Sequence, residues 1–87
     1  MSIFEEARLM DPITAAVKTI ELINNRQLIH PPEPNSDITH LHWMVDQMTA
    51  GSVIGEKAHR WLGYIQGVAV ARGAVTLEEM KEINKSS

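Results

Sequence analysis

Residues 56–73 constrain the fold most, because they combine a core-facing stripe with a row of small residues. At about 100° per residue in a helix, one side of this segment is apolar, as expected for a helix that faces a core. That side collects Ala58, Trp61, Leu62, Ile65, Val68 and Ala69. A second row recurs every three or four residues and consists of Glu56, Arg60, Gly63, Gly67 and Ala71.

Two glycines inside one helix need a reason, because each costs about 1 kcal/mol relative to alanine. Gly63 and Gly67 leave the backbone open on the second row. We therefore expect something to approach the helix closely there. Another helix of the same chain, a second copy of the protein and a ligand all remain open at this point.

The size and composition of the chain exclude several classes of protein. The chain has 87 residues, no cysteine and a formal net charge of −3. A single small domain is expected, without disulfides or thiolate metal sites, and the charge argues against a non-specific nucleic-acid binder. No apolar run approaches the roughly 20 residues of a membrane span. The first residues lack the basic and apolar regions of a signal peptide, so we expect a cytoplasmic protein.

Helix signals and stop signals divide the chain into short helices. Ser2 and Glu5 have the spacing of a capping box for a helix that ends near Met10. Further helices are predicted from Asp11 as N-cap to about residue 27 or 28, from about 37 to near Gly51, across 56–73, and from the capping box of Thr76 and Glu79 onward. Gly51 and Gly73 are predicted to end their helices in a left-handed conformation.

The predicted fold is all-α, a bundle of four to five helices in one domain spanning residues 1–87. Prolines exclude a helix from the connector at residues 30–36, which is either a recognition loop or a stiff spacer. The helices at 37–50 and 56–73 are expected to form a central antiparallel pair. We also expect a homo-oligomer, because so short a chain leaves apolar and glycine surface to bury.

Trp43 does not follow the apolar stripe of its own helix. That stripe consists of Ile38, Leu41, Met44, Val45 and Met48. Trp43 projects to the opposite side, beside His40 and Gln47, its neighbours at i−3 and i+4. A tryptophan on a polar side indicates a second packing surface or a binding surface.

Catalytic and metal-binding patterns are weak. His40 and His42 are two residues apart, so in a helix their imidazoles point in nearly opposite directions and cannot share one ion. There is no nucleophile elbow, P-loop or Glu-x-x-His pair. We therefore expect no enzyme, no metal and no cofactor.

Anion binding is the sharper prediction for the middle of the chain. Arg60 offers a planar fork for phosphate or carboxylate, with Lys57 and His59 within one turn. Trp43 and Tyr64 supply rings for stacking, while the glycines would admit a flat ligand. The alternative assigns Arg60 to a salt bridge with its i−4 neighbour Glu56 and the glycines to close helix packing.

Two segments resemble a group of small proteins of tailed bacteriophages and prophages. The segments are His40-Leu-His-Trp-Met44 and Lys57-Ala-His-Arg-Trp-Leu-Gly-Tyr-Ile-Gln-Gly67. In that group, a His-Leu-x-Trp-Met-like segment precedes an Arg-Trp-Leu-Gly-(Phe/Tyr)-(Ile/Val)-Gln-Gly segment. The resemblance covers about the second half of the chain. His42 occupies the variable position, and the connector at 30–36 has no counterpart in the group.

The resemblance implies a phage accessory protein that acts on its host in the bacterial cytoplasm. One hypothesis is a non-enzymatic homo-oligomer that sequesters a small anionic nucleotide signal of a host defence system. The alternative is an interaction module that binds and inhibits a host protein through Trp43 and the glycine row. The predicted ligand-binding residues are Arg60, Trp43, Tyr64, His40, Lys57, Gly63, Gly67 and Gln66.

Overall fold

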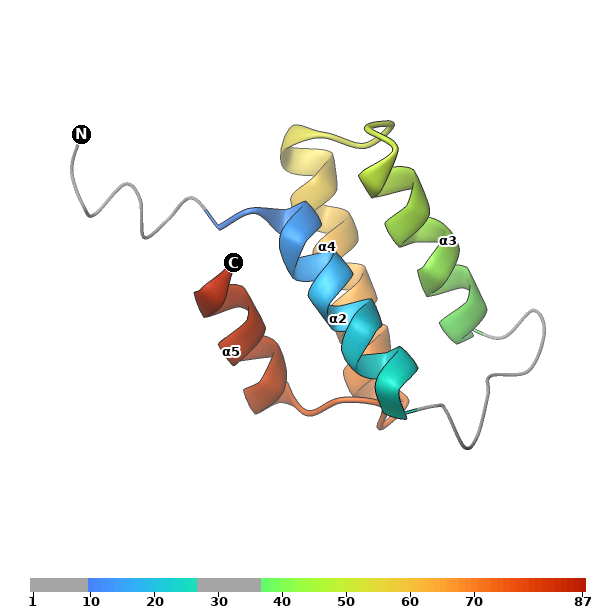
Figure 1. The fold of residues 1–87 in the computed structure, drawn as a ribbon, viewed down its shortest axis with the longest axis vertical. Coiled ribbons are helices and arrows are strands. Elements are labelled where there is room, and N and C mark those ends of the chain that lie inside the picture. The colour runs from blue at the N-terminus through green and yellow to red at the C-terminus, as the bar shows by residue number, and fades with distance from the viewer. Residues whose placement is uncertain (1–9, 27–36) are drawn as a thin grey trace.

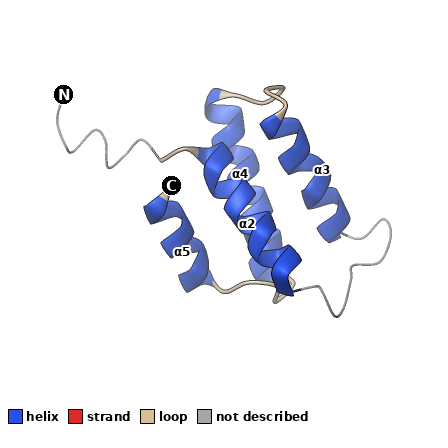
Figure 2. Ribbon diagram, viewed as in Figure 1, coloured by secondary structure: helices blue, strands red, loops and turns tan. Residues whose placement is uncertain are grey.

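The described part of the protein is a bundle in which three helices pack around a fourth. The computed structural model describes residues 10–26 and 37–87, and nothing in these two ranges is a strand (Figure 2). The helices are α2 (Pro12–Arg26), α3 (Asp37–Thr49), α4 (Gly55–Ala71) and α5 (Leu77–Ser86), as labelled in Figure 1. The all-helical class predicted from the sequence is therefore confirmed.

Two predicted segments fall outside the described residues. The connector at 30–36 lies wholly outside them. The predicted first helix lies outside them except for its last residue, Met10, which is not helical.

Side-chain caps begin two of the helices as predicted. The carboxylate of Asp11 accepts hydrogen bonds from the N–H of Ile13, at 3.1 Å, and from the hydroxyl of Thr14, and these bonds lower the pKa of Asp11. At α5, the hydroxyl of Thr76 accepts from the N–H of Glu79 at 3.1 Å, while the Glu79 carboxylate accepts from the N–H of Thr76 at 2.8 Å. This reciprocal pair satisfies two backbone donors that the helix itself leaves free.

Glycines in the left-handed conformation follow α3 and α4. The φ angles are +85° at Gly51 and +74° at Gly73. Both glycines adopt the conformation predicted for them, which residues with a side chain rarely adopt. The turn after α3 leads directly into α4, so these two helices are neighbours in the fold.

The centre of the bundle is α2, which packs against α3, α4 and α5 (Figure 1). α3 also packs against α4, whereas α5 packs chiefly on α2. A central pair of α3 and α4 is therefore not confirmed. α2 can hold several neighbours because fully buried small residues, Ala15 and Ala16, and a fully buried threonine, Thr19, line its packed sides.

The core is aliphatic and contains three methionines, two from α3 and one from α5. Its buried apolar residues are Ala15, Ala16, Ile20, Ile23, Ile38, Leu41, Met44, Val45, Met48, Val53, Ala58, Leu62, Ile65, Ala69, Val75 and Met80. The apolar stripe predicted for α3 is buried throughout. In α4 the prediction needs correction, because Trp61 and Val68 are only half-buried while Gln66 is buried.

Candidate binding surface

Four aromatic rings from α3 and α4 meet on one side of the molecule. The rings of His40 and Trp43 stack, with centroids 5.6 Å apart and planes at 17°. Trp43 lies 6.0 Å from Trp61 of α4, and His40 meets the edge of Tyr64 at 6.4 Å. We call these four residues the aromatic surface.

The aromatic surface remains open to solvent although its rings contact one another. Trp43 is 51% exposed and Tyr64 is 52% exposed. Trp43 stays exposed because the apolar stripe on the other side of α3 faces the core. Its contact with Trp61 confirms that Trp43 packs on a second helix, whereas the binding surface stays a prediction.

Positive charge lies beside these rings. The Lys57 ammonium is 5.6 Å from the centroid of the Trp61 ring, which is within the range of a cation–π contact. Arg60 is exposed on the same helix. Across the described ranges, ion pairs join Arg26 to Glu79, Arg72 to Asp37 and Lys81 to Glu78.

The salt bridge between Arg60 and Glu56, which the sequence offered as an alternative, is not formed. Neither Arg60 nor Lys57 takes part in an ion pair with any residue in the described part of the chain. Their charges are therefore available to a partner from outside.

The two interior glycines of α4 have no close neighbour among the described residues. A Cβ atom built on Gly63 or Gly67 would meet nothing within 4 Å. Close packing against another of the described helices, one of the explanations left open by the sequence, therefore does not account for these glycines.

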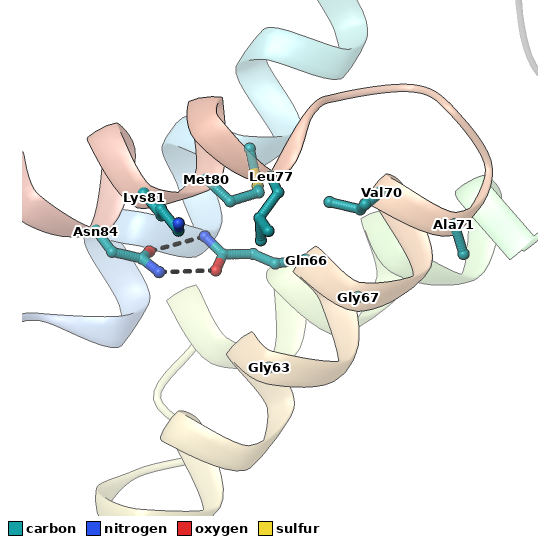
Figure 3. A pocket seen from close by; sticks show the side chains of 9 residues that line it. All are labelled: Gly63, Gln66, Gly67, Val70, Ala71, Leu77, Met80, Lys81 and Asn84. Atoms are coloured by element: carbon teal, nitrogen blue, oxygen red, sulfur yellow. Dashed lines mark hydrogen bonds between the residues drawn. The ribbon is translucent and has the colours of Figure 1, made fainter.

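A groove opens between this row and α5 (Figure 3). Its volume is about 420 Å³. It is lined by Gly63, Gln66, Gly67, Val70, Ala71, Leu77, Met80, Lys81 and Asn84. The groove exists because α4 and α5 both pack on α2 while making little contact with each other.

The floor of the groove is a pair of amides that are hydrogen-bonded to each other. Gln66 donates from Nε2 to Oδ1 of Asn84 at 2.8 Å and accepts from Nδ2 of Asn84 at 2.9 Å, as the dashed lines in Figure 3 mark. Gln66 also donates to the hydroxyl of Thr19 on α2 at 3.2 Å. With 8% of its surface exposed, Gln66 thus links three helices and has no free donor for a ligand.

The structure divides seven of the eight predicted ligand-binding residues between two surfaces. The aromatic surface and its cation bring together His40, Trp43, Tyr64 and Lys57. The groove contains Gly63, Gln66 and Gly67. Arg60 is exposed on α4 and makes no ring contact.

Sequence reasoning missed some residues of both surfaces. Trp61 was assigned to the core, although its spacing from Lys57 and Tyr64 placed it near the aromatic side as well. Leu77 and Lys81 of α5 line the groove, yet no sequence pattern indicated which side of α4 the last helix would approach.

The histidines of α3 serve different roles. His42 hydrogen-bonds through Nδ1 to the carbonyl of Ile38 at 2.9 Å, and its Nε2 faces Oδ1 of Asn24 on α2. It therefore joins two helices, whereas His40 belongs to the aromatic surface. Within residues 10–26 and 37–87, no three His, Asp or Glu side chains are arranged to hold a metal ion.

Comparisons with known proteins add no family to this description. No protein-family model matches the chain, and no curated protein or solved structure is significantly similar to it. Among the described helices, none has the length and apolar character that crossing a membrane requires.

Proposed function

We propose that this is a non-enzymatic binding protein that docks onto another protein through the aromatic surface. The half-exposed rings of Trp43 and Tyr64 carry this proposal. Tryptophan, tyrosine and arginine dominate the binding energy of protein interfaces. Trp43 of α3 and Tyr64 of α4 are residues of these kinds, and Arg60 is exposed on the helix that carries Tyr64.

The binding free energy that these side chains can contribute favours a protein partner over a small ligand. Covering the exposed half of one ring removes about 100 Å² from water, which contributes about 2.5 kcal/mol. A protein covers all the rings at once. One stacked base and one charged contact together contribute about 3–6 kcal/mol, below the roughly 8 kcal/mol of micromolar affinity.

The setting of the proposal follows from the resemblance to phage accessory proteins. The resemblance implies expression in the cytoplasm of a bacterial host, where the protein would inhibit a host protein. The short chain with its exposed glycine row suggests a homo-oligomer. The openness of Trp43 and Tyr64, each about half-exposed, supports a partner that covers both rings at once.

Matched variants test the proposal. We expect wild-type protein and Ile54→Ala, which removes an exposed apolar side chain elsewhere, to capture the same host protein. Trp43→Ala and Tyr64→Ala should lose it while keeping their helical circular dichroism. Calorimetry with the purified partner should then show binding weakened by about tenfold or more in each ring variant. Equal binding by all four proteins would rule out the aromatic surface.

A second candidate function is sequestration of an anionic nucleotide. It is favoured by Lys57 above Trp61 and by the absence of an ion pair at Arg60 within the described residues. This candidate predicts that binding of a nucleotide depends on its phosphate and disappears in Arg60→Ala. A protein complex that survives Arg60→Ala, but not Trp43→Ala, would favour the first proposal instead.

A further inference from the structure

We propose that the partner of the aromatic surface is an acidic protein, whose Asp and Glu side chains lie opposite Lys57 and Arg60, and that these two cations steer its association. The inference rests on the proposed function, because it names the chemistry of the protein that docks there. It adds the positions of the two cations beside the rings and their lack of ion pairs within the described residues.

Both cations stand one helical turn before a ring of α4. Lys57 precedes Trp61 by four residues, and its ammonium lies 5.6 Å from the centroid of that ring. Arg60 precedes Tyr64 by four residues, and residues with this spacing are neighbours on the surface of a helix. Both cationic side chains are exposed. A protein that covers the rings of α4 therefore also meets Lys57 and Arg60.

Most other cations in residues 10–26 and 37–87 are already engaged. Three form ion pairs and a fourth donates to a backbone carbonyl, namely Arg26, Arg72, Lys81 and Lys18. Lys57 and Arg60 bind no carboxylate in the same two ranges. An acidic partner therefore meets two cations beside the rings without having to displace a carboxylate of this part of the chain.

The acid of α3 closest in sequence to Trp43 lies at the outer edge of the aromatic surface. Asp46 follows Trp43 by three residues and His40 precedes it by three, so these two side chains project about 120° apart around the helix. His40 lies on the flank that contacts Tyr64 of α4. Asp46 therefore lies on the flank of α3 that faces away from α4 and from its two cations.

The formal net charge of −3 does not oppose an acidic partner at this surface. Three glutamates belong to α5, which packs chiefly on α2. Exposed charges more than about 10 Å apart are largely screened at an ionic strength of about 0.1 M. The one acid of α4, Glu56, is followed one turn later by His59 and Arg60, which are not part of the aromatic surface. The local charge beside the rings of α4 is therefore positive.

Cations in this position act mainly on the rate of association. Charges at the rim of an interface change the association rate and its dependence on salt, whereas buried contacts determine how long the complex lasts. Steering by complementary charge raises association rates by about 10 to 1,000 times. The complex should therefore survive neutralisation of Lys57 and Arg60 but form more slowly.

Surface plasmon resonance tests the inference, with the host protein that the wild-type chain captures as the purified, immobilised probe. Raising NaCl from about 50 to about 500 mM should slow association of the wild type by about tenfold or more and change dissociation little. The double variant Lys57→Gln, Arg60→Gln should associate about tenfold more slowly at low salt and lose most of this salt dependence.

Two controls remove single charges elsewhere. Lys85→Gln neutralises an exposed cation of α5 and should associate at the wild-type rate. Asp46→Asn neutralises the acid at the outer edge and should associate at the wild-type rate or faster. Slower association of Asp46→Asn, or faster association of the double variant, would show a basic partner and overturn the inference.

Trp43→Ala distinguishes failure of the inference from failure of the proposed function. Unchanged binding of Trp43→Ala, or capture of no host protein by the wild type, would overturn both. Loss of binding in Trp43→Ala, together with a double variant that associates at the wild-type rate, would overturn the acidic partner and leave docking through the rings intact. Capture of a nucleotide in place of a protein would also overturn both.

Discussion

At the scale of single residues, the glycines of this chain fall into two kinds. Gly73 has a φ of +74°, a conformation in which a side chain is strained. Gly63 lies inside α4 and has no such requirement, and an added Cβ would meet nothing within 4 Å. Its cost to the helix is therefore not offset by packing against residues 10–26 or 37–87.

We expect Gly63→Ala to raise the free energy of unfolding by about 1 kcal/mol, because alanine restricts the unfolded chain and favours the helix. Urea unfolding at a concentration where the protein is monomeric measures this gain. Gly73→Ala is the control and should instead destabilise the protein. A loss of stability in Gly63→Ala would mean that the row is already packed in the monomer.

Glu79 makes stability depend on acid pH. Its carboxylate is held chiefly by hydrogen bonds from Arg26, and next by the backbone N–H of Thr76, which lower the pKa of Glu79 to about 2. A carboxylate with a lowered pKa stabilises the folded state above its ordinary pKa and loses that contribution as the pH falls toward the folded value. The contribution should therefore disappear between about pH 4.5 and 2.

Thermal unfolding measured across this range checks the expectation. The difference in melting temperature between wild type and Glu79→Gln should be present near neutral pH and shrink below pH 4.5. Glu82→Gln, on the same helix, should show no such change. A difference between wild type and Glu79→Gln that persists at pH 2 would contradict the role of the Glu79 carboxylate.

At the scale of helices, α5 is attached largely through polar links. Met80 is its one buried residue. Arg26 of α2 bonds both to Glu79 and, at 2.9 Å, to the carbonyl of Ala74, while Asn84 joins Gln66 of α4. Such a helix contributes little core, so its position depends on these bonds.

We expect Asn84→Ala to lower the free energy of unfolding by about 1–2 kcal/mol, because the buried amide of Gln66 loses a partner. Chemical unfolding measures the change, and Asn25→Ala, at an exposed position of α2, should stay within about 0.5 kcal/mol of the wild type. A double-mutant cycle with Gln66→Ala isolates the pairwise energy. Strict additivity of the two substitutions would show that the amide pair does not stabilise the fold.

The boundaries of the helices were predictable because their signals are local. The capping side chains bond to backbone within one turn, as those of Asp11, Thr76 and Glu79 do. The left-handed conformation that follows a helix is a property of the glycine itself, here Gly51 and Gly73. The salt bridge offered for Arg60 and Glu56 also has local spacing, yet it does not form within the described residues. A spacing of four residues allows an exposed ion pair to form. Such a pair contributes too little free energy to ensure that it forms.

Residues whose neighbours come from distant segments were harder to place. Gln66 was assigned to a ligand, whereas its side chain bonds to Thr19 and Asn84 of two other helices. Trp61 was assigned to the core because it follows the apolar period of its own helix, and that period carries no information about neighbouring helices. Its half-buried position beside Trp43 depends on where α3 lies.

At the scale of the whole molecule, the arrangement of the helices could not be derived from periodicity. Apolar stripes show that each helix has a buried side, but not which helix covers it. The central position belongs to α2 because it contacts the three other helices described. The same limit applies to the candidate site, since the rings and the glycines were predicted as one ligand site while the structure separates them onto two flanks of α4.

The two flanks of α4 therefore carry different surfaces, the aromatic rings on one and the glycine groove on the other. The flank with the rings is the one that we propose docks onto another protein. Native mass spectrometry of the protein purified from its host tests this view most directly. We predict a species that carries a host protein at a fixed ratio to the chain, and loss of that protein in Trp43→Ala. A bound mass of a few hundred daltons at a fixed ratio to subunits, lost in Arg60→Ala, would contradict this account.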